Sequence, residues 1–407
     1  MNRKKIFAHM LALVALAFGL LIVLPNLSTG TIQALPQMAL TEFPWLAALV
    51  AVIALIYALR PPRVNWGVAF ALIALLLAAQ PMLQAFSVGA ALDADMRAGL
   101  GDTYLESIAP AALERVQDAR FSLLAAVGAR HFTARAAVTV DVPFSETPQR
   151  TLRLDVYQPQ IPPAAGDTYP AIVVVHGGSW RWLDKGGVFA PHNRYLASLG
   201  YVVFDIQYRF STEAIWPAQL QDVQCAVAWV RAHAATYSID PAQMALLGRS
   251  AGAHLALMAA YHDRQTPADP AECPSLMEQD TSVNAVIAIY PVTDMRMYES
   301  TPLSAITALL GGLNREVPAV YAAASPVEYV RDGLPPTLLI HGEMDNLVPT
   351  AHTELLYNLL SATDTPVARL YVPWARHGFD FLIGGLGTQI VQYDLDRFLA
   401  WVFYRQT

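Results

Sequence analysis

The sequence Gly248-Arg249-Ser250-Ala251-Gly252 decides the fold, because it lies where a short apolar run changes into a run of helix formers. Residues 243–247, QMALL, precede it, and residues 253–260, AHLALMAA, follow it. A serine on a sharp turn between a strand and a helix adopts a strained backbone conformation with its hydroxyl exposed, and flanking glycines leave room for that turn. The pentapeptide alone is a common pattern, so the prediction of a nucleophile at Ser250 depends on finding its chemical partners elsewhere in the chain.

From residue 137 onward, short apolar runs alternate with helix-forming segments. Residues 138–142 and 151–157 alternate in polarity and predict an antiparallel pair of strands. The later runs are apolar throughout, which predicts parallel strands buried on both faces and joined by helical crossovers; they are residues 171–175, 201–206, 245–247, 285–289, 337–340 and 368–372. The sequence therefore predicts an α/β domain over residues 137–407, with a mostly parallel central sheet and helices on both faces.

Three apolar stretches, at 6–24, 43–59 and 64–83, occupy the N-terminal part of the chain. Each approaches the roughly 20 residues that cross a bilayer as a helix. A cleaved signal peptide is the alternative for the first stretch, but no small-residue cleavage site follows it. We expect residues 1–88 to form a membrane anchor of three transmembrane helices. Residues 89–136 combine mixed charge with periodic apolar residues and predict an amphipathic juxtamembrane linker, which acts as a stalk or, alternatively, as a lid.

The distribution of basic residues predicts the orientation of this anchor. Arg3, Lys4 and Lys5 precede the first stretch, and Arg60 and Arg63 lie between the second and third, whereas residues 25–42 contain no Lys or Arg. Basic segments stay in the cytoplasm, so three spans leave the N-terminus cytoplasmic and the C-terminal domain extracytoplasmic. A re-entrant hairpin formed by the second and third stretches would leave the domain on the same side.

The predicted strand ends carry the residues that would activate a serine. A serine hydroxyl needs an adjacent base that a third group orients, and ligands bind at the carboxyl ends of parallel strands. His377 follows the last predicted strand, whereas the other histidines after Ser250 lie on helices or before the predicted acid. Asp345 follows the penultimate predicted strand, at 337–340, and is the predicted acid, with Glu343 and Asp294 as alternatives.

A glycine pair follows the strand at 171–175. Gly177 and Gly178 offer backbone N–H groups without an obstructing side chain, and the N–H of Ala251 follows the nucleophile. Such donors stabilise the oxyanion of a tetrahedral intermediate. We therefore predict an oxyanion hole formed by Gly177, Gly178 and Ala251.

These motifs, taken in order, resemble one known family. The series His176-Gly177-Gly178-Ser179-Trp180, Gly248–Gly252, Asp345 and His377-Gly378-Phe379 resembles the α/β-hydrolases of the carboxylesterase and lipase kind. The likeness is greatest to the branch with an H-G-G-x-W motif, which includes BD-FAE-type, hormone-sensitive-lipase-like and arylformamidase-like enzymes. The resemblance implies an α/β-hydrolase fold, with Ser250 as nucleophile, Asp345 as acid and His377 as base, and a structural role for Asp222. Ser179 stands where lipase-type relatives carry a third glycine.

The expected function is a membrane-anchored serine hydrolase that cleaves small or lipid-like carboxylic esters through an acyl-enzyme. Alternatives are an acyltransferase, a formamidase or peptidase with the same triad, and an inactive binding module. Tryptophans near the strand ends, Trp180, Trp216 and Trp374, are expected to line the substrate pocket. The chain carries no metal, Walker or dinucleotide-binding motif, so we expect no metal and no cofactor.

Charge and cysteine content add two further constraints. The net charge of −7 and the absence of a basic cluster outside the membrane flanks argue against nucleic acid as a partner. An extracytoplasmic domain would allow Cys225 and Cys273 to pair, but two free thiols are the alternative that the sequence leaves open.

Overall fold

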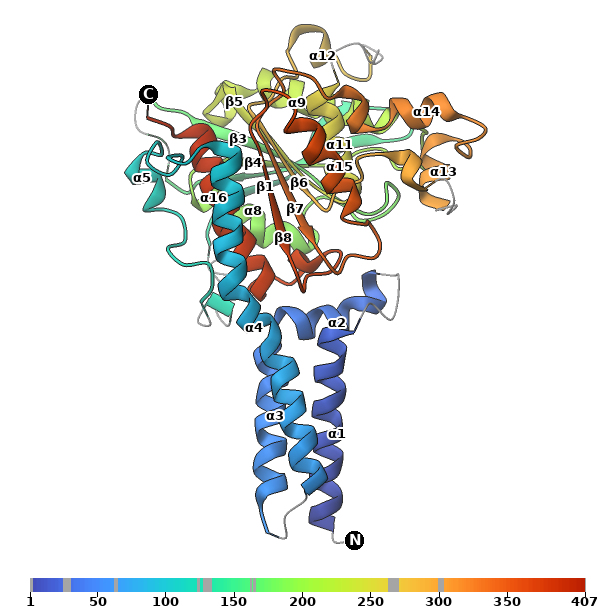
Figure 1. Cartoon of the computed structure of the whole chain (residues 1–407). Coiled ribbons are helices and arrows are strands. Elements are labelled where there is room, and N and C mark those ends of the chain that lie inside the picture. The colour runs from blue at the N-terminus through green and yellow to red at the C-terminus, as the bar shows by residue number, and fades with distance from the viewer. Residues whose placement is uncertain are drawn as a thin grey trace.

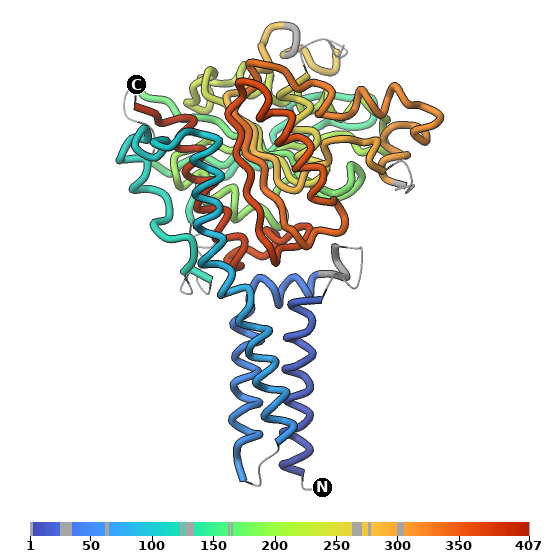
Figure 2. The backbone as a smooth tube through the Cα atoms, viewed as in Figure 1, coloured from blue at the N-terminus to red at the C-terminus, as the bar shows by residue number. Residues whose placement is uncertain are grey.

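An eight-stranded sheet forms the centre of the C-terminal part of the chain (Figure 1). The structure, a computed structural model, describes residues 3–24, 31–61, 65–122, 125–126, 134–161, 163, 166–262, 271–298 and 304–406. A bundle of helices projects from one side of the sheet domain, with the N-terminus at its far end and the C-terminus on the opposite side of the molecule (Figure 2).

The sheet has the order β1-β2-β4-β3-β5-β6-β7-β8. Its strands are β1 Ala137–Glu146, β2 Thr151–Gln158, β3 Tyr169–Val175, β4 Val202–Ile206, β5 Ile239–Arg249, β6 Ala285–Ile289, β7 Thr337–Gly342 and β8 Val367–Val372. The pairs β1–β2 and β2–β4 are antiparallel and the remaining pairs are parallel. This arrangement confirms the predicted mostly parallel sheet with an antiparallel pair at one edge.

Helices cover both faces of the sheet, as the apolar strands require. Successive residues of β3 point to opposite cores: Val173 packs with α9 Ala218–Ala232, α11 Ala251–Tyr261 and α15 Ala351–Leu360, whereas Val174 packs with α8 Ala190–Ser198 and α16 Leu386–Phe403. The shorter elements are α5 Pro110–Leu113, α10 Ala234–Tyr237, α12 Ser275–Glu278, α13 Ser304–Leu310, α14 Pro318–Ala323, η1 Gly187–Phe189, η2 Met295–Tyr298, η3 Pro326–Tyr329 and η4 Phe379–Phe381.

Two elements differ in extent from the sequence prediction. Strand β5 begins at Ile239, ahead of the predicted run at 245–247, and its pairing with β3 shifts in register between Ile239 and Met244. The shift accommodates Pro241, which has no N–H to donate to the sheet. The predicted helical crossover between the runs at 201–206 and 245–247 divides at His233 into α9 and α10.

The N-terminal region forms three adjacent helices, α1 Arg3–Val23, α3 Pro44–Leu59 and α4 Asn65–Leu100, with α2 Thr31–Glu42 lying across the end that faces the sheet domain (Figure 1). Among the described residues, α1 and α4 are each long and apolar enough to cross a membrane, and a bend of 82° separates α3 from the end of α2. Helix α2 was not predicted, because its apolar residues are interrupted by polar ones and by Pro36. Its buried residues Met38, Thr41 and Glu42 pack at the junction between bundle and domain.

Helix α4 continues beyond Leu83 to Leu100, so the third apolar stretch and the start of the expected linker form one helix. Near its end Gly99 touches the sheet, since a Cβ there would lie 2.0 Å from the carbonyl oxygen of Val367 on β8. Further along, Arg120 forms an ion pair with Asp394 on α16 at 2.6 Å. The described part of residues 89–136 therefore packs along β8 and α16.

A disulfide joins Cys225, on α9, to Cys273, in the segment before α12. It closes a loop with a sequence separation of 48 residues. Of the two alternatives that the sequence leaves open, the structure has the bridge.

Candidate active site

Ser250 lies on the turn between β5 and α11, at the carboxyl end of β5. Its backbone has φ 53° and ψ −120°, a conformation that a residue with a side chain adopts only under strain. Glycine is required on both sides of Ser250, because the backbone of neighbouring segments lies too close for a side chain. A Cβ on Gly252 would lie 2.1 Å from the carbonyl oxygen of Val175, and a Cβ on Gly248 would lie 2.2 Å from the carbonyl oxygen of Gly252. The local sequence thus forms the tight strand-to-helix turn that it predicts.

His377 and Asp345 lie next to this serine. The Ser250 hydroxyl donates to His377 Nε2 at 3.0 Å, and His377 Nδ1 donates to Asp345 Oδ2 at 2.6 Å. Asp345 follows β7 and His377 follows β8, so neighbouring parallel strands deliver both side chains to the same edge. This is the geometry of a hydroxyl whose proton passes to an imidazole that a carboxylate orients.

Surrounding donors fix the Asp345 carboxylate. The backbone N–H groups of Leu347 and Val348 both donate to its Oδ1 at 2.9 Å. Burial disfavours the ionised form, but His377 and a contact from His341 outweigh it and hold the pKa of Asp345 below its usual range. The carboxylate is therefore ionised at neutral pH and stabilises positive charge on His377.

The glycine turn after β3 lies beside the serine. A Cβ on Gly177 would lie 3.5 Å from Ser250 Cβ, and Gly178 has a φ of +113° that suits only glycine. Burial lowers the pKa of His176 to about 4, so its ring is neutral and its Nδ1 donates to the carbonyl oxygen of Gly177 at 2.7 Å. Ala251 is the first residue of α11. The three predicted oxyanion residues are thus adjacent to Ser250.

A cavity of about 180 Å³ opens over the serine and the histidine. It is lined by Ser250 and His377, the glycines 177 and 178, and largely apolar side chains that include Trp182, Leu183, Phe189, Leu347 and Phe381. Trp182 is 39% exposed at this site, and the rings of Phe189 and Phe381 lie 5.0 Å apart. The walls therefore suit an apolar group of an ester.

The structure corrects the predicted pocket tryptophans. Among the described residues that line this cavity, none is Trp180, Trp216 or Trp374, and all three are buried. The Trp180 indole donates to His254 Nδ1 at 3.2 Å, and the Trp216 ring packs 5.6 Å from the same histidine. Both tryptophans therefore pack against α11, which carries His254. Trp182, two residues beyond Trp180, is the tryptophan whose side chain lines the cavity.

The alternative acids and Asp222 lie in other environments. Asp294 pairs with Arg296 at 2.8 Å, and Glu343 is exposed. Asp222 is buried and binds the Arg209 guanidinium at 2.7 Å, which fits the structural role implied by the resemblance.

Three polar residues around the triad were not predicted. The Asp380 carboxylate accepts from Arg249 Nε and from the Tyr290 hydroxyl, each at 2.5 Å, and the Tyr290 ring lies 4.5 Å from the His377 ring. Arg249 precedes Ser250, so this network joins the serine turn to the histidine loop. Proximity to motif residues was the only sequence signal for them, because no spacing rule links positions 249, 290 and 380.

Comparisons with known proteins support the same grouping. The BD-FAE family model matches residues 154–360. The chain is 33% identical over 245 residues to the probable carboxylic ester hydrolase LipM and 32% identical over 277 residues to esterase LipQ, both of Mycobacterium tuberculosis. These alignments cover 59% and 67% of this chain, but 56% and 64% of the relatives, so the chain spans less than two thirds of their length.

Solved structures agree with the family match. Esterase 2 of Thermogutta terrifontis, in its propionate-bound and paraoxon-phosphorylated forms, is 26% identical with a TM-score of 0.53. The likeness covers 67% of this chain and 96% of that enzyme. The predicted resemblance is thereby confirmed: this chain belongs to the BD-FAE family of α/β-hydrolases.

Proposed function

We propose that this protein is a serine esterase that cleaves carboxylic esters through an acyl-enzyme, with Ser250 as nucleophile, His377 as base and Asp345 as acid. The observation that carries the proposal is the continuous hydrogen-bonded series from Ser250 through His377 to Asp345, which opens into a largely apolar cavity. The esterases among its relatives support the choice of reaction.

The proposed steps follow from this geometry. Ser250 Oγ attacks the ester carbonyl carbon while its proton passes to His377 Nε2, and the Asp345 carboxylate stabilises the imidazolium. The N–H groups at Gly177, Gly178 and Ala251 stabilise the oxyanion. Collapse of this intermediate expels the alcohol, which takes the proton from His377, and leaves the acyl group on Ser250. Water, deprotonated by His377, then attacks the acyl carbon. Collapse of the second intermediate releases the acid as Ser250 Oγ leaves and takes the proton back from His377.

The cavity favours esters with small apolar acyl or aryl groups. Its volume of about 180 Å³ is below the roughly 300–1,000 Å³ of pockets for drug-sized ligands. The propionate-bound form of the Thermogutta esterase supports short acyl groups as substrates. The site also lies next to the bundle, since Arg376, the residue before His377, contacts the carbonyl oxygen of Leu24 at the end of α1. This position favours esters that concentrate at a membrane surface.

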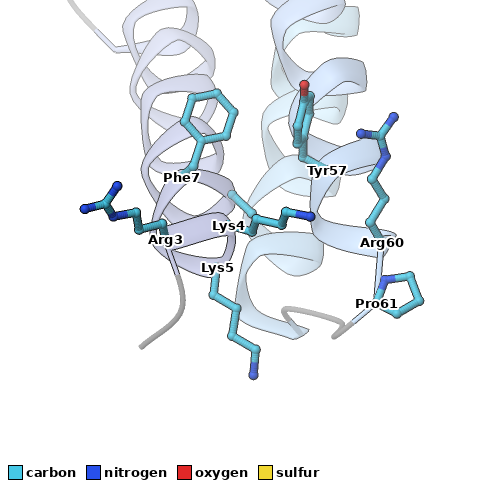
Figure 3. A pocket seen from close by; sticks show the side chains of 8 residues that line it. Arg3, Lys4, Lys5, Phe7, Tyr57, Arg60 and Pro61 are labelled. Atoms are coloured by element: carbon cyan, nitrogen blue, oxygen red, sulfur yellow. The ribbon is translucent and has the colours of Figure 1, made fainter.

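We further propose that the bundle anchors the protein in a membrane, with the catalytic domain outside the cytoplasm. Figure 3 shows the far end of the bundle, where Arg3, Lys4, Lys5 and Arg60 surround a cavity of about 360 Å³. Such a basic end is typical of the cytoplasmic side. The disulfide between Cys225 and Cys273 supports an oxidising compartment for the domain at the other end.

Turnover of aryl esters of graded acyl length by the detergent-purified protein tests the reaction. We expect acetyl to butyryl esters to be cleaved fastest, and Ser250→Ala to lose about 10⁶-fold in kcat. Asp345→Asn should lose about 10⁴-fold. Equal rates for wild type and Ser250→Ala would refute the assignment, as would a fluorophosphonate probe that labels another residue.

The site's position beside the bundle also favours a second candidate, acyl transfer to a membrane alcohol. Addition of excess glycerol or lipid alcohol during turnover separates the two, since a transferase would yield the new ester in place of the free acid. For the orientation, a reporter fused after Phe403 should be active only outside the cytoplasm.

A further inference from the structure

The loop that carries His377 touches the carboxyl end of helix α1. Arg376, the residue before His377, is 1% exposed, and its Nη2 donates to the carbonyl oxygen of Leu24 at 2.7 Å. The same nitrogen lies 3.4 Å from the carbonyl oxygen of Ile22 and 3.5 Å from that of Leu21. The guanidinium therefore caps the last turn of α1, some 350 residues away in sequence.

The electrostatics favour this contact. The last carbonyl groups of a helix lack partners within the helix and carry the negative end of its dipole, so a cation is stabilised there. Burying a guanidinium is costly unless such acceptors compensate it. Burial lowers the pKa of Arg376 to about 10, so the side chain is still charged at neutral pH.

A second contact holds the other end of residues 376–388, the segment that carries His377. Glu42, the last residue of α2, is fully buried and accepts hydrogen bonds from the N–H groups of Gly387 at 2.8 Å and Thr388 at 3.3 Å, in the first turn of α16. A Cβ on Gly387 would lie 2.8 Å from Glu42 Oε1, so the glycine permits this approach. Residues 376–388, which include His377, are thus attached to α1 at one end and to α2 at the other.

The opposite side of this segment contacts residues around the catalytic triad. Asp380 binds Arg249 and Tyr290, and the Tyr290 ring packs on His377. The imidazole is therefore held between the domain's own network and the N-terminal helices.

We propose that Arg376 is a positioning residue for His377 and that helix α1 is part of the active-site scaffold as well as an anchor. The proposal rests on the proposed function, because it assigns His377 as the base. Loss of the Arg376 contact would let the histidine loop shift, and a shift of about 1 Å in a catalytic group can cost about 10²-fold in rate.

The chain provides a matched control. Gln37, on α2, donates from Nε2 to the carbonyl oxygens of Leu21 at 2.9 Å and Leu24 at 3.0 Å, so it caps the same end of α1 without being next to His377. Comparison of Arg376→Met with Gln37→Met separates support of the histidine from capping of the helix. Arg376→Lys restores the charge and one donor.

The experiment measures kcat, KM, melting temperature and the fluorophosphonate labelling rate of Ser250 in the full-length protein in detergent. We expect Arg376→Met to lose about 10- to 100-fold in kcat and labelling rate with little change in KM. Arg376→Lys should be intermediate, and Gln37→Met should melt earlier but keep its kcat. If Arg376→Met does not fold, the loss in Arg376→Lys relative to Gln37→Met carries the test.

Two results would overturn the proposal: wild-type kcat in folded Arg376→Met, or an equal loss of kcat in Gln37→Met. Failure of the ester assignment is distinguishable. A wild type that labels at Ser250 but cleaves no ester would refute the proposed reaction, while the labelling rates would still decide the role of Arg376.

Discussion

The helical bundle and the sheet domain are both rich in apolar residues, but the bundle buries small apolar side chains and the domain buries large ones. The contacts between α1, α3 and α4 are made by small residues such as Ala12, Ala51 and Ala74, all at most 1% exposed. Large side chains point outward there, with Leu49 55% and Leu76 72% exposed. In the domain, large side chains such as Leu339 fill the interior.

The difference reflects the solvent for which each region is suited. Water drives large apolar side chains into a core, whereas lipid does not, so helices in lipid associate by close backbone approach at small residues. An outward-facing Leu76 costs nothing in lipid but would expose a large apolar surface to water. The reversal of packing is thus physical support for the proposed anchor, independent of hydropathy.

Exchange of a large for a small interior residue gives the largest expected effect. Leu339→Ala should destabilise the domain by about 2–5 kcal/mol, since it removes buried contacts and leaves a cavity. In the bundle the damaging change is the reverse one, from small to large. Ala51→Leu should destabilise the bundle by about 1–3 kcal/mol, because the added volume separates the helices. Urea unfolding of the full protein in detergent measures the first, and protease resistance of the bundle measures the second.

Ala51→Gly serves as the control, because it adds no volume to the helix contact. Unchanged domain stability in Leu339→Ala would contradict the assigned core. A bundle that tolerates Ala51→Leu without a change in protease resistance would show that its small residues are not needed for packing.

A charge on an exposed apolar position sharpens the comparison further. Lysine at the centre of a membrane helix costs about 2.5–3.5 kcal/mol, so Leu76→Lys should lower the membrane-inserted fraction. Ile161, 79% exposed on the domain, already faces water, and Ile161→Lys should change stability by no more than about 0.5 kcal/mol. Carbonate extraction followed by immunoblotting measures the membrane-inserted fraction of Leu76→Lys, and urea unfolding in detergent measures the stability of Ile161→Lys. Full insertion of Leu76→Lys would argue that this face of α4 is not in contact with lipid.

The two regions also differ in how far sequence alone describes them. The mostly parallel sheet, the alternation of strands and helices along the chain, and the proximity of Ser250, Asp345 and His377 could be predicted, because parallel strands bring their carboxyl ends to one edge. The direction of a side chain beyond a strand end could not, so Trp180 was assigned to a cavity that Trp182 lines. Contacts between distant segments, such as Arg376 with α1 and Glu42 with α16, depend on the packing of bundle on domain and leave no local pattern.

The two regions differ lastly in their ionisable residues, and a change at one of them in the domain has the smallest expected effect on stability. Asp205, on β4, is 2% exposed and accepts from Asn193 Nδ2 at 2.8 Å and from the N–H of Gly186 at 2.6 Å. Burial raises its pKa to about 7, with Asp155 adding to the shift and Arg249 opposing it. The apolar stretches of the bundle, in contrast, contain only His9 of the Asp, Glu, Lys, Arg and His types.

The sign of the pH effect follows from this shift. The pKa of Asp205 is higher in the folded protein than the roughly 3.9 of an unfolded chain, so the folded state binds the extra proton. Its contribution to stability is fully present below about pH 4 and is lost as the pH rises through about 7. Asp205→Asn should therefore gain stability relative to wild type between pH 4 and 7, as measured by melting temperature at each pH. A difference between Asp205→Asn and wild type that stays flat over that range would mean that the Asp205 carboxylate ionises normally in the fold.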